Sequence, residues 1–422
     1  MHHTLLSEID IIKDSLSREY ETPYGCLYTP FDEGSFSACQ TLAERLKTRN
    51  PTLFILVGIG GSNMGALAVV QAMKGSRYYE GPPLRFYCAD TIDNDATKSL
   101  IREIERELEE GGVPVLCIIT KSGSTTETLI NGALLYECIK KYRPLDYHEY
   151  IIVISDEGSA LYSVADAMGC ERLPVPPAVG GRYSVFSAVG MFPLMMMGID
   201  GASFARGSRL MLERCLSKDS NENEAAASAT TIFNAYLAGC VIHDIFVFSP
   251  ALAMLGYWYK QLIGESLGKK HDSTGALVEV GISPTVSLGT VDLHSVVQLY
   301  LAGPRIRLTT FLSFDHEPTD LEVPDNHISG VLQGLAGRSV TFVKDTIQTG
   351  VMQAYATEKR PFMDLTLAYK SSEKLGEFMM MKMVETIFLA RLFSINAFDQ
   401  PAVELYKEQA RKSARKSDEK VR

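Results

Sequence analysis

The sequence predicts an α/β protein with two doubly wound parallel sheets, each an α/β/α sandwich, and with helical segments at the N- and C-terminal ends. Short apolar, β-branched runs alternate with helical patterns over residues 53–154, which is typical of a parallel sheet. A second alternating series begins near Ile245. The chain has 422 residues, enough for two or three domains with sizeable cores.

We expect five segments along the chain. They are an N-terminal helical segment (1–50), a first sheet domain (51–200), a helical connection (201–235), a second sheet domain (236–396) and a C-terminal helix with a tail (397–422). Asn50-Pro51 ends the first segment, because the residue before proline disfavours helix. The likeness between the two sheet domains depends on pattern alone, since no sequence repeat is visible.

The individual elements follow from length and periodicity. In the first domain we expect strands at 53–57, 84–88, 115–119 and 151–154, and helices ending at Met73, over 95–110 and over 129–141. In the second we expect strands at 245–248, 307–314 and 339–342, with a buried helical face over 252–262.

Composition excludes several classes of protein. Hydrophobic residues make up 46% and charged residues 22%, as in an ordinary globular protein, and the net charge of -10 argues against nucleic-acid binding. The eight cysteines include no C-x-x-C pair, which argues against a zinc site or a disulfide framework. The most apolar stretches, 241–263 and 378–395, contain charged residues and do not read as membrane spans. With no signal-peptide pattern at the N-terminus, we expect a cytoplasmic enzyme.

Residues 120–128 form the most informative stretch, which we call the hydroxyl turn. It joins the end of a predicted strand to the start of a predicted helix and contains six hydroxyl side chains, together with Lys121 and Gly123. Open α/β sheets bind ligands at such an edge, and a helix N-terminus favours an anion. A phosphate is the simplest ligand. The alternative is an ordinary helix N-cap, which needs only one hydroxyl.

A glycine loop follows the first predicted strand, at residues 58–65. Its Gly58-x-Gly60 pattern and Asp90 at the end of the next strand suggest a dinucleotide site, but Asn63 stands where a third glycine belongs. We prefer a second backbone cradle facing the same ligand, with Gly61 and Ser62 closest to it.

Two further stretches carry groups suited to acid–base chemistry. Arg182 follows a glycine pair and precedes an apolar helix, which suits a fixed cation over an anion or, equally, a structural ion pair. Gln261 and Glu265 share one face of an apolar helix. A partly desolvated Glu265 suits a general base, whereas a solvated glutamate at a helix end is the simpler interpretation.

The last candidates lie near two helix starts. His294 follows Asp292 by two residues and is either an acid–base group or a partly buried histidine beside an N-cap. Phe398-Asp399-Gln400-Pro401 begins the final helix, which carries Lys407 and continues into a charged tail.

Six ordered motifs together resemble the glucose-6-phosphate isomerase (phosphoglucose isomerase) family, in its short bacterial form. They lie at residues 58–62, 121–128, 180–184, 264–269, 292–295 and 400–407. The resemblance implies two sugar-isomerase (SIS) domains, a homodimer, and reversible conversion of glucose 6-phosphate to fructose 6-phosphate without metal or cofactor.

The resemblance also implies a role for each matched residue. Thr120, Lys121, Ser122 and Thr125 would hold the phosphate, Gly61 and Ser62 would line the sugar, and Glu127, Gln261 and Gln400 would be supporting polar groups. Glu265 would be the base and Arg182 would stabilise the enediolate. Lys407 and His294 would handle ring opening, with His294 reaching in from the partner subunit.

Two residues depart from the family pattern. Thr120 stands where serine is usual and keeps the hydroxyl, while Leu267 stands where a polar residue is common, which affects the surroundings of Glu265. The alternative functions are a dual phosphoglucose and phosphomannose isomerase, a non-catalytic sugar-phosphate sensor, and a nucleotide-dependent oxidoreductase.

Overall fold

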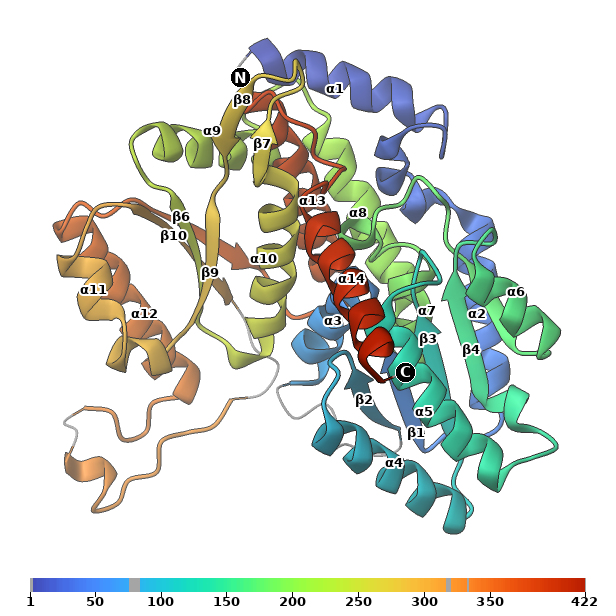
Figure 1. The fold of residues 1–422 in the computed structure, drawn as a ribbon. Coiled ribbons are helices and arrows are strands. Elements are labelled where there is room, and N and C mark those ends of the chain that lie inside the picture. The colour runs from blue at the N-terminus through green and yellow to red at the C-terminus, as the bar shows by residue number, and fades with distance from the viewer. Residues whose placement is uncertain (1–2, 76–83, 316–319, 332–333, 422) are drawn as a thin grey trace.

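The computed structural model describes residues 3–75, 84–315, 320–331 and 334–421. Two parallel sheets stand apart, with a layer of helices between them and further helices outside each (Figure 1). The predicted α/β class with two parallel sheets is therefore confirmed. The boundaries of the five predicted segments remain a prediction.

The first sheet has the strand order β2-β1-β3-β4-β5, and every pairing is parallel. Its strands are β1 (Leu53–Val57), β2 (Arg85–Ala89), β3 (Pro114–Ile119), β4 (Ile151–Ser155) and β5 (Glu171–Pro174). Both faces are buried, as doubly wound sheets require. On β1, Leu53 and Ile55 join the core under α4 (Asn94–Glu109), α5 (Thr126–Tyr142) and α6 (Ala160–Ala167). Phe54 and Leu56 join the opposite core, under α2 (Glu33–Lys47), α3 (Met64–Lys74) and α7 (Ala188–Met196).

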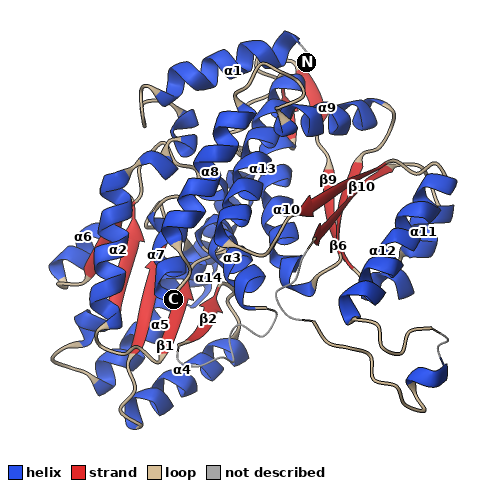
Figure 2. Ribbon diagram, turned by 180° about the vertical axis from the view of Figure 1, so that it is seen from behind, coloured by secondary structure: helices blue, strands red, loops and turns tan. Residues whose placement is uncertain are grey.

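The second sheet has the order β11-β10-β6-β9, again parallel throughout. Its strands are β6 (Ile242–Val247), β9 (Ser283–Leu288), β10 (Arg307–Phe314) and β11 (Phe362–Leu367). Phe246 and Phe311 pack against Tyr355 on the outer face, where α11 (Val297–Ala302) and α12 (Val340–Thr357) lie. Figure 2 shows the same separation of the two sheets from behind.

The helical layer between the sheets consists mainly of α3, α8 (Gly201–Cys215), α10 (Ala253–Leu267) and α13 (Ser372–Leu392). The remaining helices are α1 (His3–Leu16), α9 (Glu224–Leu237) and α14 (Val403–Val421), and β7 (Lys269–His271) pairs with β8 (Leu277–Val280) as an antiparallel hairpin. Short 3-10 turns lie at Pro23–Leu27, Thr29–Phe31, Gly60–Ser62, Tyr147–Tyr150, Gly181–Tyr183, Pro250–Leu252, Val291–His294 and Ser329–Val331. Across the described ranges, no helix is both long and apolar enough to cross a membrane.

The predicted strand at 339–342 is wrong. The Ser339 side chain accepts from the Phe342 N–H and caps α12, so the β-branched residues there begin a helix. Five strands were also missed: β7 and β8 of the short hairpin, and β5, β9 and β11 of the parallel sheets. The last three lie at sheet edges, where polar residues or proline interrupt the apolar run that identifies a central strand.

Candidate active site

The hydroxyl turn connects the end of β3 to the start of α5, as predicted. Gly123 has φ +62°, and a Cβ there would lie 2.7 Å from the Cβ of Ser159. Glycine is therefore required for both the backbone angle and the close approach. Ser155 Oγ donates to the Thr120 carbonyl (2.7 Å) and stabilises the turn from β4.

The simple helix-cap interpretation of this turn does not hold. Thr125 occupies the N-cap position of α5, yet its hydroxyl bonds with Thr120 Oγ1 (2.8 Å) and caps no backbone N–H. The first N–H groups of α5 thus have no side-chain cap from Thr125, and they carry the positive end of the helix dipole. Such a terminus suits an anionic ligand.

Lys121 is a half-buried cation in the same turn. Its Nζ donates to the Pro177 carbonyl (2.6 Å). Burial lowers the pKa of this ammonium from its ordinary 10.5, while Asp156 acts in the opposite direction. The expected phosphate ligands Thr120, Lys121, Ser122 and Thr125 therefore lie on one short turn, with Glu127 in the first turn of α5.

The glycine loop lies beside this turn, because β1 and β3 are parallel neighbours and end at the same sheet edge. A Cβ on Gly61 would lie 2.1 Å from the Gly181 carbonyl carbon, so the loop packs directly on the backbone next to Arg182. A Cβ on Gly60 would lie 2.8 Å from Gln261 Nε2. Ser62 is half-buried in the same 3-10 turn. The loop thus connects the hydroxyl turn with α10.

Glu265 lies between a neutral amide and a cation. Gln261 Nε2 donates to Glu265 Oε1 (3.1 Å), which confirms that both side chains share one face of α10. Arg182 Nη1 donates to Glu265 Oε2 (3.3 Å). The Glu265 side chain remains 35% exposed whereas that of Arg182 is 3% exposed, so the carboxylate is accessible while the cation beside it is buried.

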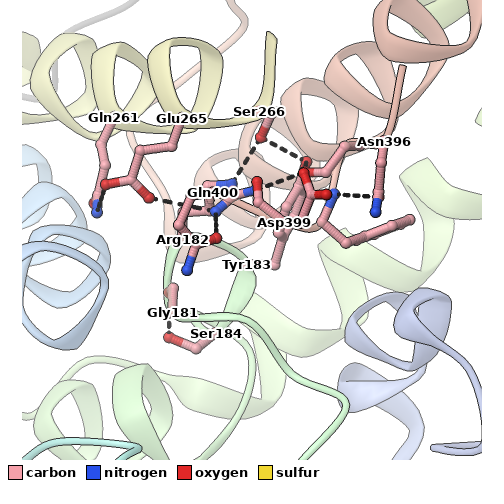
Figure 3. A network of polar contacts seen from close by, with 12 residues as sticks. Gly181, Arg182, Tyr183, Ser184, Gln261, Glu265, Ser266, Asn396, Asp399 and Gln400 are labelled. Atoms are coloured by element: carbon pink, nitrogen blue, oxygen red, sulfur yellow. Dashed lines mark hydrogen bonds and ion pairs between the residues drawn. The ribbon is translucent and has the colours of Figure 1, made fainter. Parts of the chain in front are cut away.

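Arg182 uses its whole guanidinium group (Figure 3). Nε donates to Ser266 Oγ (2.8 Å), and Nη1 also donates to Gln400 Oε1 (2.7 Å). Nη2 donates to the carbonyls of Ala397 (2.6 Å) and Asp399 (3.1 Å). We call these residues the Arg182 cluster: Arg182, Gln261, Glu265, Ser266, Asp399 and Gln400. They come from three distant parts of the chain, joined by a buried planar donor.

The helix that carries Glu265 is anchored by a second polar group deep in the core. Tyr259 Oη donates to Glu385 Oε1 (2.7 Å), and Glu385 pairs with Lys382 (2.7 Å), whose side chain is fully buried. His243 lies beside Tyr259, and burial, with Lys382, lowers the pKa of His243 to about 3. A satisfied buried network of this kind fixes the position of α10 against α13.

The structure does not join every predicted site residue to the Arg182 cluster. His294 is exposed at the end of a 3-10 turn. Lys407 lies on α14, where its ammonium pairs with Glu404 (2.7 Å). Four residues near Glu265 and Arg182 were not predicted as site residues: Ser266, Lys269, Asp399 and Tyr183. The Tyr183 Oη bonds with Ser266 Oγ (2.9 Å). All four lie inside or next to the motifs, but only the fold shows that they meet.

The acidic residue that a dinucleotide site would use, Asp90, is bonded to another side chain. Asp90 accepts a hydrogen bond from Asn63 Nδ2 (3.0 Å), which is the residue that replaces the third glycine of that pattern. The acid that follows β2 and the substituted position in the glycine loop are therefore bonded to each other.

The structure defines an α/β protein with two parallel sheets flanked by helices, in which strand-to-helix turns meet at one sheet edge. The family model described as Phosphoglucose isomerase matches residues 47–422, and the chain belongs to this family of enzymes.

Individual proteins are similar to this chain in sequence or in fold. The glucose-6-phosphate isomerase of Carboxydothermus hydrogenoformans is 33% identical over 359 residues, which cover 83% of this chain and 76% of that protein. A hypothetical protein of Thermus thermophilus has a solved structure with a TM-score of 0.86 at 28% identity, covering 97% of this chain and 96% of the other. The glucose-6-phosphate isomerase structure from Chlamydia trachomatis shares the fold, with a TM-score of 0.79 at 23% identity over 91% of this chain and 74% of that one.

Proposed function

We propose that this chain interconverts glucose 6-phosphate and fructose 6-phosphate, and that Glu265 moves the proton between C2 and C1. The observation that carries the proposal is the accessible carboxylate of Glu265, held between Gln261 and Arg182. A base whose two oxygens are both oriented is positioned for proton abstraction next to a carbonyl.

The proton transfer balances with one carboxylate. Glu265 takes the C2 proton of the open-chain aldose, the C–H electron pair forms the C1–C2 double bond, and the carbonyl pair moves to O1. Glu265 then returns the proton to C1, O2 becomes the ketone oxygen, and the proton of O2 passes to O1. Arg182 stabilises the enediolate charge without being able to donate its own proton, since guanidinium stays protonated in proteins.

The hydroxyl turn is the proposed phosphate site. Thr120, Lys121, Ser122 and Thr125 hold the phosphate against the start of α5, while Gly61 and Ser62 line the sugar. Phosphate binding positions the reacting carbons, and proximity of this kind can supply about 7–11 kcal/mol. The proposed reaction uses neither a metal nor a cofactor.

Ring opening is assigned to His294 and Lys407. The exposed position of His294 agrees with a homodimer in which this side chain enters the partner subunit's site. The eight cysteines are free thiols, which fits the reducing conditions of the expected cytoplasmic location.

One assay set tests the proposal. Purified chain is given glucose, mannose or glucosamine 6-phosphate in D₂O, with and without EDTA, and products and deuterium at C1 and C2 are followed by NMR. We expect fructose 6-phosphate from glucose 6-phosphate, unaffected by EDTA. Equal turnover of mannose 6-phosphate would establish a dual isomerase. Binding without turnover or exchange would show a sugar-phosphate sensor and reject the proposal.

A further inference from the structure

Lys269 is a buried lysine at the junction of α10 and β7. It is 8% exposed, and its ammonium donates to the backbone carbonyls of Glu265 (2.7 Å) and Ser266 (3.0 Å). These carbonyls lie in the last turn of α10, where backbone acceptors lack partners within the helix. A cation there also complements the helix dipole. Lys269 therefore fixes the backbone from which Glu265 projects.

The third donor of Lys269 leads to another segment. Nζ donates to the Asp399 carbonyl (2.9 Å), the same oxygen that accepts from Arg182 Nη2 (3.1 Å). The Asp399 carboxylate is 3.4 Å from the ammonium. Two buried cations thus converge on one carbonyl, next to Gln400 and just before the helix that carries Lys407.

Burying the Lys269 ammonium costs free energy, because the charge loses its hydration. Burial lowers the pKa of the Lys269 ammonium and Arg182 acts in the same direction, while Asp399 opposes them. Three donors bonded to three carbonyls, beside a carboxylate, offset the desolvation of the charge. Lys269 therefore fixes the relative positions of the Glu265, Ser266 and Asp399 backbone carbonyls.

We propose that Lys269 is a positioning residue. It holds the end of α10 against the Asp399–Gln400 segment, so that Glu265 faces both C1 and C2 of the substrate. The inference rests on the proposed function of Glu265. Lys269 does not touch the substrate and acts through the backbone of Glu265 and Asp399. Because misplacement of a catalytic group by about 1 Å can cost about 100-fold in rate, loss of this lysine should slow the chemistry.

The test compares Lys269→Met with Lys270→Met, a neighbouring lysine in β7 whose side chain is exposed. Each protein converts glucose 6-phosphate carrying deuterium at C2, in ordinary water. The fraction of label that reaches C1 of fructose 6-phosphate measures how often Glu265 returns the deuterium to the intermediate before it exchanges with water. This fraction does not depend on how much protein is folded, so a merely structural role would not change it.

We expect Lys269→Met to reduce the transferred fraction at least about twofold and kcat per folded molecule about 10- to 100-fold, with KM within about threefold. Lys270→Met should match the wild type in all three. If Lys269→Met fails to fold, Lys269→Arg gives the same comparison, because a guanidinium cannot reach the three carbonyls in the same geometry. Unchanged transfer and unchanged kcat in the folded variant would overturn the inference. A wild type that makes no fructose 6-phosphate would instead reject the proposed function.

Discussion

The hydroxyl turn and the Arg182 cluster differ in how the chain builds them. The turn is a single stretch of nine residues between β3 and α5. Its hydroxyl groups bond to one another within the stretch, while β4 and the Pro177 carbonyl support its backbone and Lys121. The Arg182 cluster joins residues 83 to 218 positions apart in the sequence, through one buried guanidinium. One site is formed by a strand-to-helix connection, and the other exists only after the whole chain has folded.

The difference separates two tasks. A local turn on a sheet edge suits binding, because the helix N-terminus is present as soon as β3 and α5 pack together. Proton transfer needs a carboxylate held in a fixed orientation, which requires rigid support from several elements. Changes in the turn should therefore affect substrate affinity, and changes in the cluster should affect the rate of the chemical step.

The largest effect is expected for Glu265→Gln, which keeps the shape and removes the base. We expect kcat to fall about 10²- to 10⁴-fold, the usual contribution of general acid–base catalysis, with KM nearly unchanged. Steady-state kinetics with Glu110→Gln as an exposed control would measure it. Near-normal turnover of Glu265→Gln would mean that the cluster is not the site of proton transfer.

Arg182→Lys is expected to come next. Lysine keeps the charge but has three donors, too few for the five acceptors that Arg182 now serves. We expect a loss of about 10²- to 10³-fold in kcat and a lower Tm, since a buried acceptor without a donor costs about 1–3 kcal/mol. Arg305→Lys is a matched control, because Arg305 bonds two backbone carbonyls at the surface. Similar kinetics for both variants would contradict a role for Arg182 beyond folding.

The same contrast explains what could be predicted from the sequence. The central strands β1, β3 and β4 are uninterrupted apolar runs, and Gly123 with its hydroxyl neighbours marks the turn between strand and helix. Gln261 and Glu265 could be paired because helix periodicity is local.

Long-range features could not be predicted from residue patterns. Nothing in the sequence around Lys269 indicates that its ammonium meets the Asp399 carbonyl, 130 positions away. Ser339 stands before a β-branched run, and its hydrogen bond with the Phe342 N–H shows that the run begins a helix. The edge strands β9 and β11 have a pairing partner on one side only, and polar residues interrupt the apolar run in each.

Lys121→Ala should affect binding alone. Hydrogen bonds to charged groups contribute about 1.5–3 kcal/mol, so we expect KM to rise about 10- to 100-fold while kcat stays within about threefold. Lys141→Ala, at the far end of α5, should leave both constants unchanged. A fall in kcat with unchanged KM would place Lys121 in the chemical step and remove the distinction between the two regions.

The smallest effect concerns pH. Because burial lowers the pKa of Lys121, the free enzyme should lose this charge at a lower pH than an ordinary lysine would. KM should then rise with pH, by at most about tenfold per pH unit above that pKa, while kcat follows less closely because bound phosphate keeps the ammonium protonated. Lys121→Arg stays charged, so its KM should remain level to higher pH. The measurement is a KM profile from neutral to alkaline pH for wild type, Lys121→Arg and Lys141→Arg. An identical rise of KM at alkaline pH in all three proteins would assign the titration to another group. It would contradict the proposal that Lys121 is the cation that binds the phosphate.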